Sequence, residues 1–158
     1  MVKIKIAIAG VGNCASNFVQ GIEYYKKDLN NSIGLVHRRL GKYDITDIEF
    51  VAAFDISKTK VGEDLSDAIF KYPNNTKIVS PVPKLNVIVE KGPILDVWNE
   101  KFADFFEISD SLASNVEGIL RKTKADILVI LLPTGSDKAC EYYVEAMNSY
   151  IEWSIKAL

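Results

Sequence analysis

Hydrophobic and polar residues alternate over the first part of the chain as they do in a β-strand. Between residues 3 and 9 isoleucine occupies every second position, and a period of two places those side chains on one face of a sheet. The apolar run then meets a glycine-rich turn, after which apolar residues recur at helical spacing from Phe18 to Tyr25. No proline interrupts the chain before Pro73. The pattern predicts a strand, a tight turn and a helix over residues 3–27.

The turn between this strand and helix reads Gly10-Val11-Gly12-Asn13-Cys14-Ala15, which is G-x-G-x-x-A. Between a strand and a helix, this spacing is typical of a dinucleotide-binding turn. Gly10 allows the tight turn, Gly12 lets a pyrophosphate approach the backbone, and Ala15 keeps the helix close to the strand. The helix N-terminus would offer its N–H groups and the positive end of its dipole. The alternative is a tight turn that binds no ligand.

A second strand is predicted over residues 48–55 and ends in Asp55. In a nucleotide-binding βαβ unit, an acidic residue at this point accepts hydrogen bonds from the adenine ribose. Asp55 lies farther from the glycines than the usual ~20 residues, and a polar insertion over residues 28–47 accounts for the delay. Its charge would repel a 2′-phosphate, which favours NAD over NADP. The alternative is a carboxylate that caps the turn after the strand.

Apolar periodicity along the rest of the chain alternates between helix and strand. It predicts helices over residues 58–72, 95–108 and 111–124 and from Ser136 onward, and strands over residues 87–89, 126–132 and 151–155. This order predicts one α/β domain over residues 1–158, a Rossmann-like doubly wound parallel sheet of about five strands with helices on both faces. The continuous apolar run over 126–132 is typical of a buried parallel strand. A ligand would lie where the first and fourth strands end, at 10–15 and 133–136.

Composition excludes several classes of protein. The 158 residues include 48% apolar and 25% charged residues with a net charge of −2, and the scattered Lys and Arg residues do not predict nucleic-acid binding. The sequence contains no run of 18 apolar residues, so it predicts no membrane-spanning helix. The two cysteines, Cys14 and Cys140, are too few for a disulfide framework or a metal site, so we expect a cytoplasmic protein. Cys14 is either a small packing residue or a reactive thiol at a helix N-terminus.

Several longer runs carry a resemblance to a known family. They are residues 10–16, 19–25, 47–55, 60–69, 74–76, 92–93 and 132–136. These runs resemble the inositol-phosphate synthases, in particular the nucleotide-binding part of the shorter prokaryotic branch.

The resemblance implies an NAD-dependent isomerase that converts glucose 6-phosphate to myo-inositol phosphate by internal oxidation, aldol cyclisation and reduction. Such an enzyme serves inositol and phospholipid biosynthesis, and the family's full-length proteins are homo-oligomers. At matching positions, the implied cofactor-binding residues are Gly10, Gly12, Asn13, Cys14, Ala15, Asp55, Asp64, Pro133, Thr134, Gly135, Ser136 and Tyr143.

The chain also departs from the family. The synthases carry a second, mixed α/β domain whose lysines and acidic residues bind the substrate phosphate and move protons. Residues 1–158 do not contain this second domain. We therefore assign no catalytic residue and no metal, and expect glucose 6-phosphate to bind only if that domain is supplied. The alternatives are a stand-alone, regulatory NAD-binding module derived from the family, and an unrelated dehydrogenase with the same fold.

Overall fold

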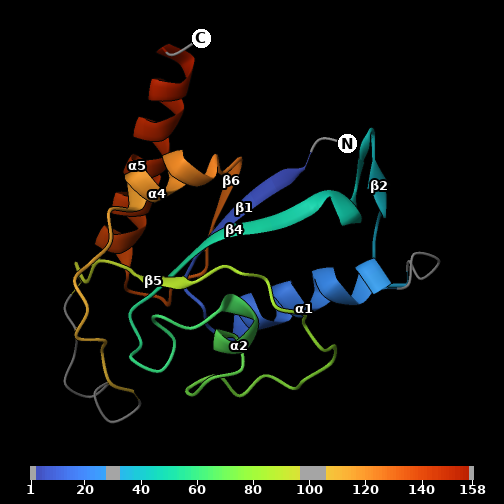
Figure 1. Cartoon of the computed structure of the whole chain (residues 1–158), viewed down its shortest axis with the longest axis horizontal. Helices are drawn as coiled ribbons and strands as arrows, with labels where there is room; N and C mark the ends of the chain where they lie inside the picture. The colour runs from blue at the N-terminus through green and yellow to red at the C-terminus, as the bar shows by residue number, and fades with distance from the viewer. Residues whose placement is uncertain (1–2, 28–32, 97–105, 157–158) are drawn as a thin grey trace.

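The computed structural model describes residues 3–27, 33–96 and 106–156. Its central sheet has four parallel strands in the order β5-β4-β1-β6. The strands are β1 (Ile4–Ala9), β4 (Ile48–Asp55), β5 (Val89–Lys91) and β6 (Ile127–Ile130). The helices are α1 (Asn13–Lys27), α2 (Leu65–Ala68), α4 (Val116–Thr123) and α5 (Asp137–Lys156). Figure 1 shows α1 and α2 on one side of the sheet and α4 and α5 on the other.

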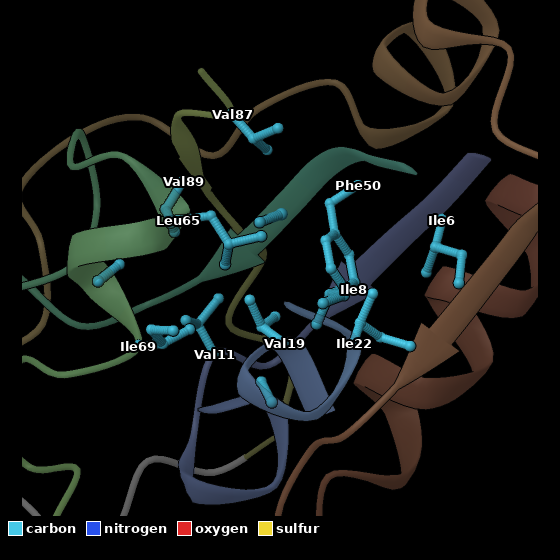
Figure 2. Close-up of a cluster of buried hydrophobic side chains, with 13 residues drawn as sticks. Ile6, Ile8, Val11, Val19, Ile22, Phe50, Leu65, Ile69, Val87 and Val89 are labelled. Atoms are coloured by element: carbon cyan, nitrogen blue, oxygen red, sulfur yellow. The ribbon is translucent and has the colours of Figure 1, made fainter. Parts of the chain in front are cut away.

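The strand alternation builds a hydrophobic core on each face of the sheet. Ile6 and Ile8 of β1 point into the cluster that contains residues of α1 and α2, as Figure 2 shows. Ala7 and Ala9, the residues between and after them, face the cluster formed with α4 and α5. The small alanines allow Phe54 and Tyr143 to pack in the second core, with ring centroids 5.7 Å apart. The predicted doubly wound α/β fold is therefore present, with helices covering both faces.

The described part of the polar insertion, residues 33–47, includes a small second sheet that does not pair with the main sheet. A two-stranded antiparallel hairpin, β2 (Arg39–Leu40) with β3 (Tyr43–Asp44), leads into the 3-10 helix η1 (Ile45–Asp47). The carboxylate of Asp44 accepts from Thr46 N–H at 3.1 Å, and the carboxylate of Asp47 accepts from Asp44 N–H at 2.9 Å. This reciprocal cap starts η1, whose last residue is followed directly by the first residue of β4.

Several predicted boundaries shift for local reasons. The helix predicted over 58–72 is reduced to α2, because Gly62 adopts a positive φ of 89° and Asp64 caps a new start. The helix predicted over 111–124 begins only after its N-cap Asn115 and ends at Thr123, because the next residue, Lys124, has a positive φ of 54°. The short strand predicted over 87–89 forms two residues later as β5. Of the short helix predicted over 95–108, residues 97–105 lie outside the described part of the chain.

The fifth strand predicted over residues 151–155 is wrong, because these residues continue α5. Residues 137–156 contain neither glycine nor proline, so nothing in the backbone ends the helix. Ile151 and Ile155 are also four residues apart, a spacing that fits a helix as well as alternation fits a strand. As a result, the described sheet has four strands, and β6 lies at its edge.

Candidate nucleotide-binding site

The two glycines of the turn after β1 are required for different reasons. Gly10 has a φ of 94°, and a Cβ at this position would lie 2.7 Å from the carbonyl oxygen of Leu131. The fold itself therefore demands glycine at this position. At Gly12, by contrast, φ is not positive, and apart from its two chain neighbours no heavy atom of the described residues lies within 4 Å of where a Cβ would stand. Gly12 leaves an open space beside the backbone, and a pyrophosphate needs such a space to approach it.

The N-terminus of α1 faces the same open space. Ser16 N–H donates to the carbonyl of Gly12 at 2.9 Å, so the N–H groups of Asn13, Cys14 and Ala15 belong to the first turn, where a helix offers no acceptor. No acidic side chain occurs in that first turn. No acidic side chain of α1 itself therefore opposes the positive end of its dipole, and the free N–H groups suit an anionic group.

Asp55 lies at the end of β4, next to the glycine turn, and both oxygens of its carboxylate accept hydrogen bonds from backbone N–H groups. One oxygen accepts from Val11 N–H at 2.8 Å, and the other accepts from the N–H groups of Ile56 and Ser57, each at 2.8 Å. These contacts match the alternative prediction for Asp55, a carboxylate that caps the turn after β4. The bond to Val11 shows that the same carboxylate also holds the glycine turn. Whether Asp55 also contacts a ribose stays a prediction.

The carbonyl of Val11 is held from the opposite side by two residues that the motif analysis did not single out. Lys60 Nζ donates to it at 2.8 Å and Asn74 Nδ2 donates to it at 3.0 Å. Lys60 is only 3% exposed, and burial lowers the pKa of its ammonium although Asp55 acts in the opposite direction. Both residues occur in runs that carry the family resemblance, which is the one signal that could have indicated them.

The side chain of Asn13 is committed to a neighbouring loop. Its carbonyl oxygen accepts from Asn75 N–H at 3.0 Å and from the hydroxyl of Thr76 at 2.7 Å, and its amide donates to Asn75 at 2.9 Å. Residues 74–76 thus fasten the start of α1 to the segment after α2. Asn13 would therefore serve a ligand through its backbone N–H, with its side chain fixing the turn.

The second predicted segment, residues 133–136, follows β6 at the end of the sheet where the glycine turn also lies, the carboxyl ends of the strands. Leu131 N–H donates to the carbonyl of Ala9 at 2.7 Å, which places this segment beside the glycine turn. Pro133, Thr134 and Gly135 are exposed. The Ser136 carbonyl accepts from Cys140 N–H at 2.9 Å, as expected of an N-cap position. In addition, both carboxylate oxygens of Asp96 accept from the first turn of α5, from Lys138 and Ala139 N–H at 3.0 Å each.

Two predicted residues have their polar groups directed elsewhere. Asp64 caps α2 and accepts from the N–H of Ser66 at 3.0 Å and of Leu85 at 3.2 Å. Burial alone would raise its pKa, but these bonds and the Ser66 hydroxyl hold the pKa below its usual range. Tyr143 is 2% exposed in the core beside α4, where burial, followed by the charge of Asp55, raises its pKa. Its hydroxyl would clash with a Cβ at Gly92.

Within residues 3–27, 33–96 and 106–156, no group of three His, Cys, Asp or Glu side chains is placed to hold a metal ion. No helix in that part of the chain is long and apolar enough to cross a membrane.

A parallel Rossmann-like sheet with a glycine turn leading into a helix defines the class of α/β fold to which this chain belongs. No protein-family model matches the chain. Individual relatives do: the inositol-3-phosphate synthase of Mycobacterium tuberculosis is 47% identical over 145 residues, and that of Corynebacterium glutamicum is 42% identical over 145 residues. Each alignment covers 90% of this chain and 40% of the relative.

Two solved structures share the fold of this chain. The crystal structure of Ari2 matches 94% of this chain and 43% of its own with a TM-score of 0.74 and 32% identity. A myo-inositol-1-phosphate synthase-related protein from Thermotoga maritima shares the fold, with a TM-score of 0.60, 22% identity and coverage of 84% of this chain and 35% of its own. The predicted resemblance is confirmed: over nine-tenths of its length the chain is homologous to inositol-3-phosphate synthases, and it spans about 40% of their length.

Proposed function

We propose that this chain binds NAD at the carboxyl ends of β1, β4 and β6, with the pyrophosphate on the N-terminus of α1. The observation that supports this most strongly is the open space at Gly12. Its φ is not positive and no described residue beyond its chain neighbours crowds it, so neither backbone conformation nor crowding requires glycine at that position. A pyrophosphate that approaches the backbone supplies that reason.

On this proposal each segment of the site has a separate task. The N–H groups of residues 12–15 receive the pyrophosphate, and residues 133–136 lie beside the nicotinamide. Asp55 holds Val11 in place at 2.8 Å, and its negative charge at the end of β4 disfavours the 2′-phosphate of NADP. Asp64 and Tyr143 act by shaping the scaffold. NAD would supply a hydride acceptor and donor.

We further propose that the site serves an inositol-phosphate synthase reaction, in which glucose 6-phosphate is converted to myo-inositol phosphate. The names of the relatives at 42–47% identity support this proposal. General acid–base catalysis requires titratable groups within hydrogen-bond reach of the substrate. We propose that those groups, and the contacts of a homo-oligomer, come from polypeptide beyond these 158 residues. A stand-alone regulatory module would share the NAD site and lack turnover.

Calorimetric titration with NAD tests the cofactor proposal. Gly12→Val fills the open space without meeting any protein atom within 4 Å of its Cβ, so we expect a folded protein whose Kd for NAD rises at least about tenfold. Gly21→Ala is the matched control, because its Cβ on α1 also meets nothing within 4 Å. It should bind NAD as the wild type does. Equal affinities for wild type and Gly12→Val, or no saturable binding by the wild type, would reject the site.

A further inference from the structure

The carbonyl of the peptide group between Val11 and Gly12 accepts a hydrogen bond from a buried ammonium group. Lys60 Nζ lies 2.8 Å from the Val11 oxygen and 2.8 Å from Asn74 Oδ1. Asn74 Nδ2 reaches the same Val11 oxygen at 3.0 Å and the carbonyl of Ile69 at 2.9 Å. One carbonyl oxygen therefore accepts from two side chains, one of them an ammonium with 3% exposure.

The charge of this ammonium is only partly balanced. Asp55 Oδ2 lies 3.9 Å from Lys60 Nζ, beyond hydrogen-bond distance, and that same oxygen already accepts from Val11 N–H at 2.8 Å. The other oxygen of Asp55 accepts two further N–H groups, those of Ile56 and Ser57. Lys60 thus directs its proton donors at neutral oxygens, and its positive charge adds to that of the adjacent helix N-terminus.

A donor on a carbonyl oxygen polarises the whole peptide group. Hydrogen bonds arranged in a chain strengthen one another, because each polarises the next. The nitrogen of the gripped peptide belongs to Gly12, and within the described residues no hydrogen bond uses its N–H. A charge-assisted bond at the carbonyl end is among the strong ones. The Gly12 N–H consequently becomes a better donor toward the open space in front of it.

We propose that Lys60 is a positioning residue for an anionic diphosphate: through the Val11 carbonyl, and with Asn74, it fixes the glycine turn and strengthens the Gly12 N–H as a donor. This inference rests on the proposed NAD site and adds a residue that does not itself touch the ligand. It also explains why a lysine is kept in a nearly dry position, where burial disfavours its charge.

The test compares Lys60→Met with Lys71→Met in ¹⁵N-labelled protein titrated separately with NAD and with inorganic pyrophosphate. Lys71 is a matched control that loses the same charge from a side chain that is 45% exposed and 3.4 Å from Glu63. We expect Lys60→Met to raise the Kd for both probes about tenfold or more, the loss typical of a charged hydrogen bond. Its Gly12 ¹⁵N resonance should move upfield before any ligand is added. Lys71→Met should show neither change.

The outcomes separate this inference from the cofactor proposal. If wild-type protein shows no saturable response to either probe, both proposals fall. If wild type binds but Lys60→Met binds equally well, or keeps the Gly12 resonance unchanged, only the role of Lys60 is overturned. If Lys60→Met does not fold, Asn74→Ala removes one of the two donors to Val11 and should raise both Kd values about threefold. Wild-type affinity in that variant would overturn the inference.

Discussion

At the scale of single residues, substitutions at Gly10 and Gly62 distinguish the cost of a steric clash from the cost of placing a side chain at a positive φ. Its φ of 94° is unfavourable for any side chain, and its Cβ would stand 2.7 Å from the backbone oxygen of Leu131. We expect Gly10→Ala to lower the free energy of unfolding by about 3 kcal/mol or more, measured by urea denaturation. Gly62→Ala is the control, since its φ is 89° but its surroundings are open, and it should cost about 1 kcal/mol. Equal costs would contradict the predicted clash.

Asp55 offers a second test at this scale. Asp55→Ala leaves the N–H groups of Val11, Ile56 and Ser57 without their acceptor and removes the charge 3.9 Å from Lys60 Nζ. We expect a loss of about 3 kcal/mol in unfolding free energy, because an uncompensated buried charge remains. Asp67→Ala, an exposed position on α2, should change stability by only about 0.5 kcal/mol. If the two variants prove equally stable, Asp55 does not brace the turn.

The sequence predicted the roles of the glycines better than those of the polar residues around them. Glycines in G-x-G-x-x-A have tasks set by local backbone geometry, which a short window of sequence shows. The contact of Lys60 with Val11 joins residues 49 positions apart, and no local pattern indicates it. For Asp55, the sequence left a ribose ligand and a turn cap as alternatives. The structure shows the capping contacts because both oxygens meet backbone donors.

At the scale of elements, α2 depends on its cap. Asp64 accepts from Ser66 N–H, the Ser66 hydroxyl and Leu85 N–H, and we expect Asp64→Ala to cost about 2 kcal/mol near neutral pH. Because its pKa lies below the usual 3.8, this stabilisation is complete above pH 3.8 and is lost as pH falls through the lower, folded-state pKa. Urea denaturation from pH 7 downward should show the two proteins converging only below pH 3.8. A constant difference would refute this origin.

Regular elements were predictable where local pattern and tertiary position agree. The strand predicted over residues 48–55 matches β4 exactly in its bounds, and the first strand and helix match closely. The error over residues 151–155 arose because five residues of alternation also fit the spacing of a helix that has no stop signal. The long helix predicted over residues 58–72 failed because one glycine conformation, a φ of 89° at Gly62, is invisible in apolar periodicity.

At the scale of the whole molecule, β6 has an exposed apolar flank. Its residues were predicted to be buried on both faces, yet it is an edge strand of the described sheet, with Ile127 45% exposed. A shallow groove of about 210 Å³ runs between β6 and α5, lined by Asp126, Ile127, Leu128, Ile130, Val144, Met147 and Asn148. The C-terminal end of α5 also extends beyond the sheet in Figure 1. A sequence alone cannot tell a central strand from an edge strand when both are apolar.

This flank predicts self-association of the isolated chain. Unpaired strand edges and exposed apolar surface promote association between copies, and an edge lysine opposes it. We expect Ile127→Lys to shift the sedimentation distribution of the chain toward the monomer and to leave its Kd for NAD unchanged. Lys122→Ala, an exposed position at the end of α4, serves as the control and should not change the distribution. A monomeric wild type would show that the exposed flank of β6 does not promote self-association.

An anionic cofactor on the N-terminus of α1 would shift the amide resonances of the residues that hold it, and a residue-resolved NAD titration of the ¹⁵N-labelled chain measures those shifts. We expect saturable amide shifts that are largest at residues 10–15, with smaller ones at residues 134–136. The amides of the hairpin, β2 and β3, lie outside the main sheet and should not respond. Shifts centred on any other part of the chain, or none that saturate, would contradict this placement of the cofactor.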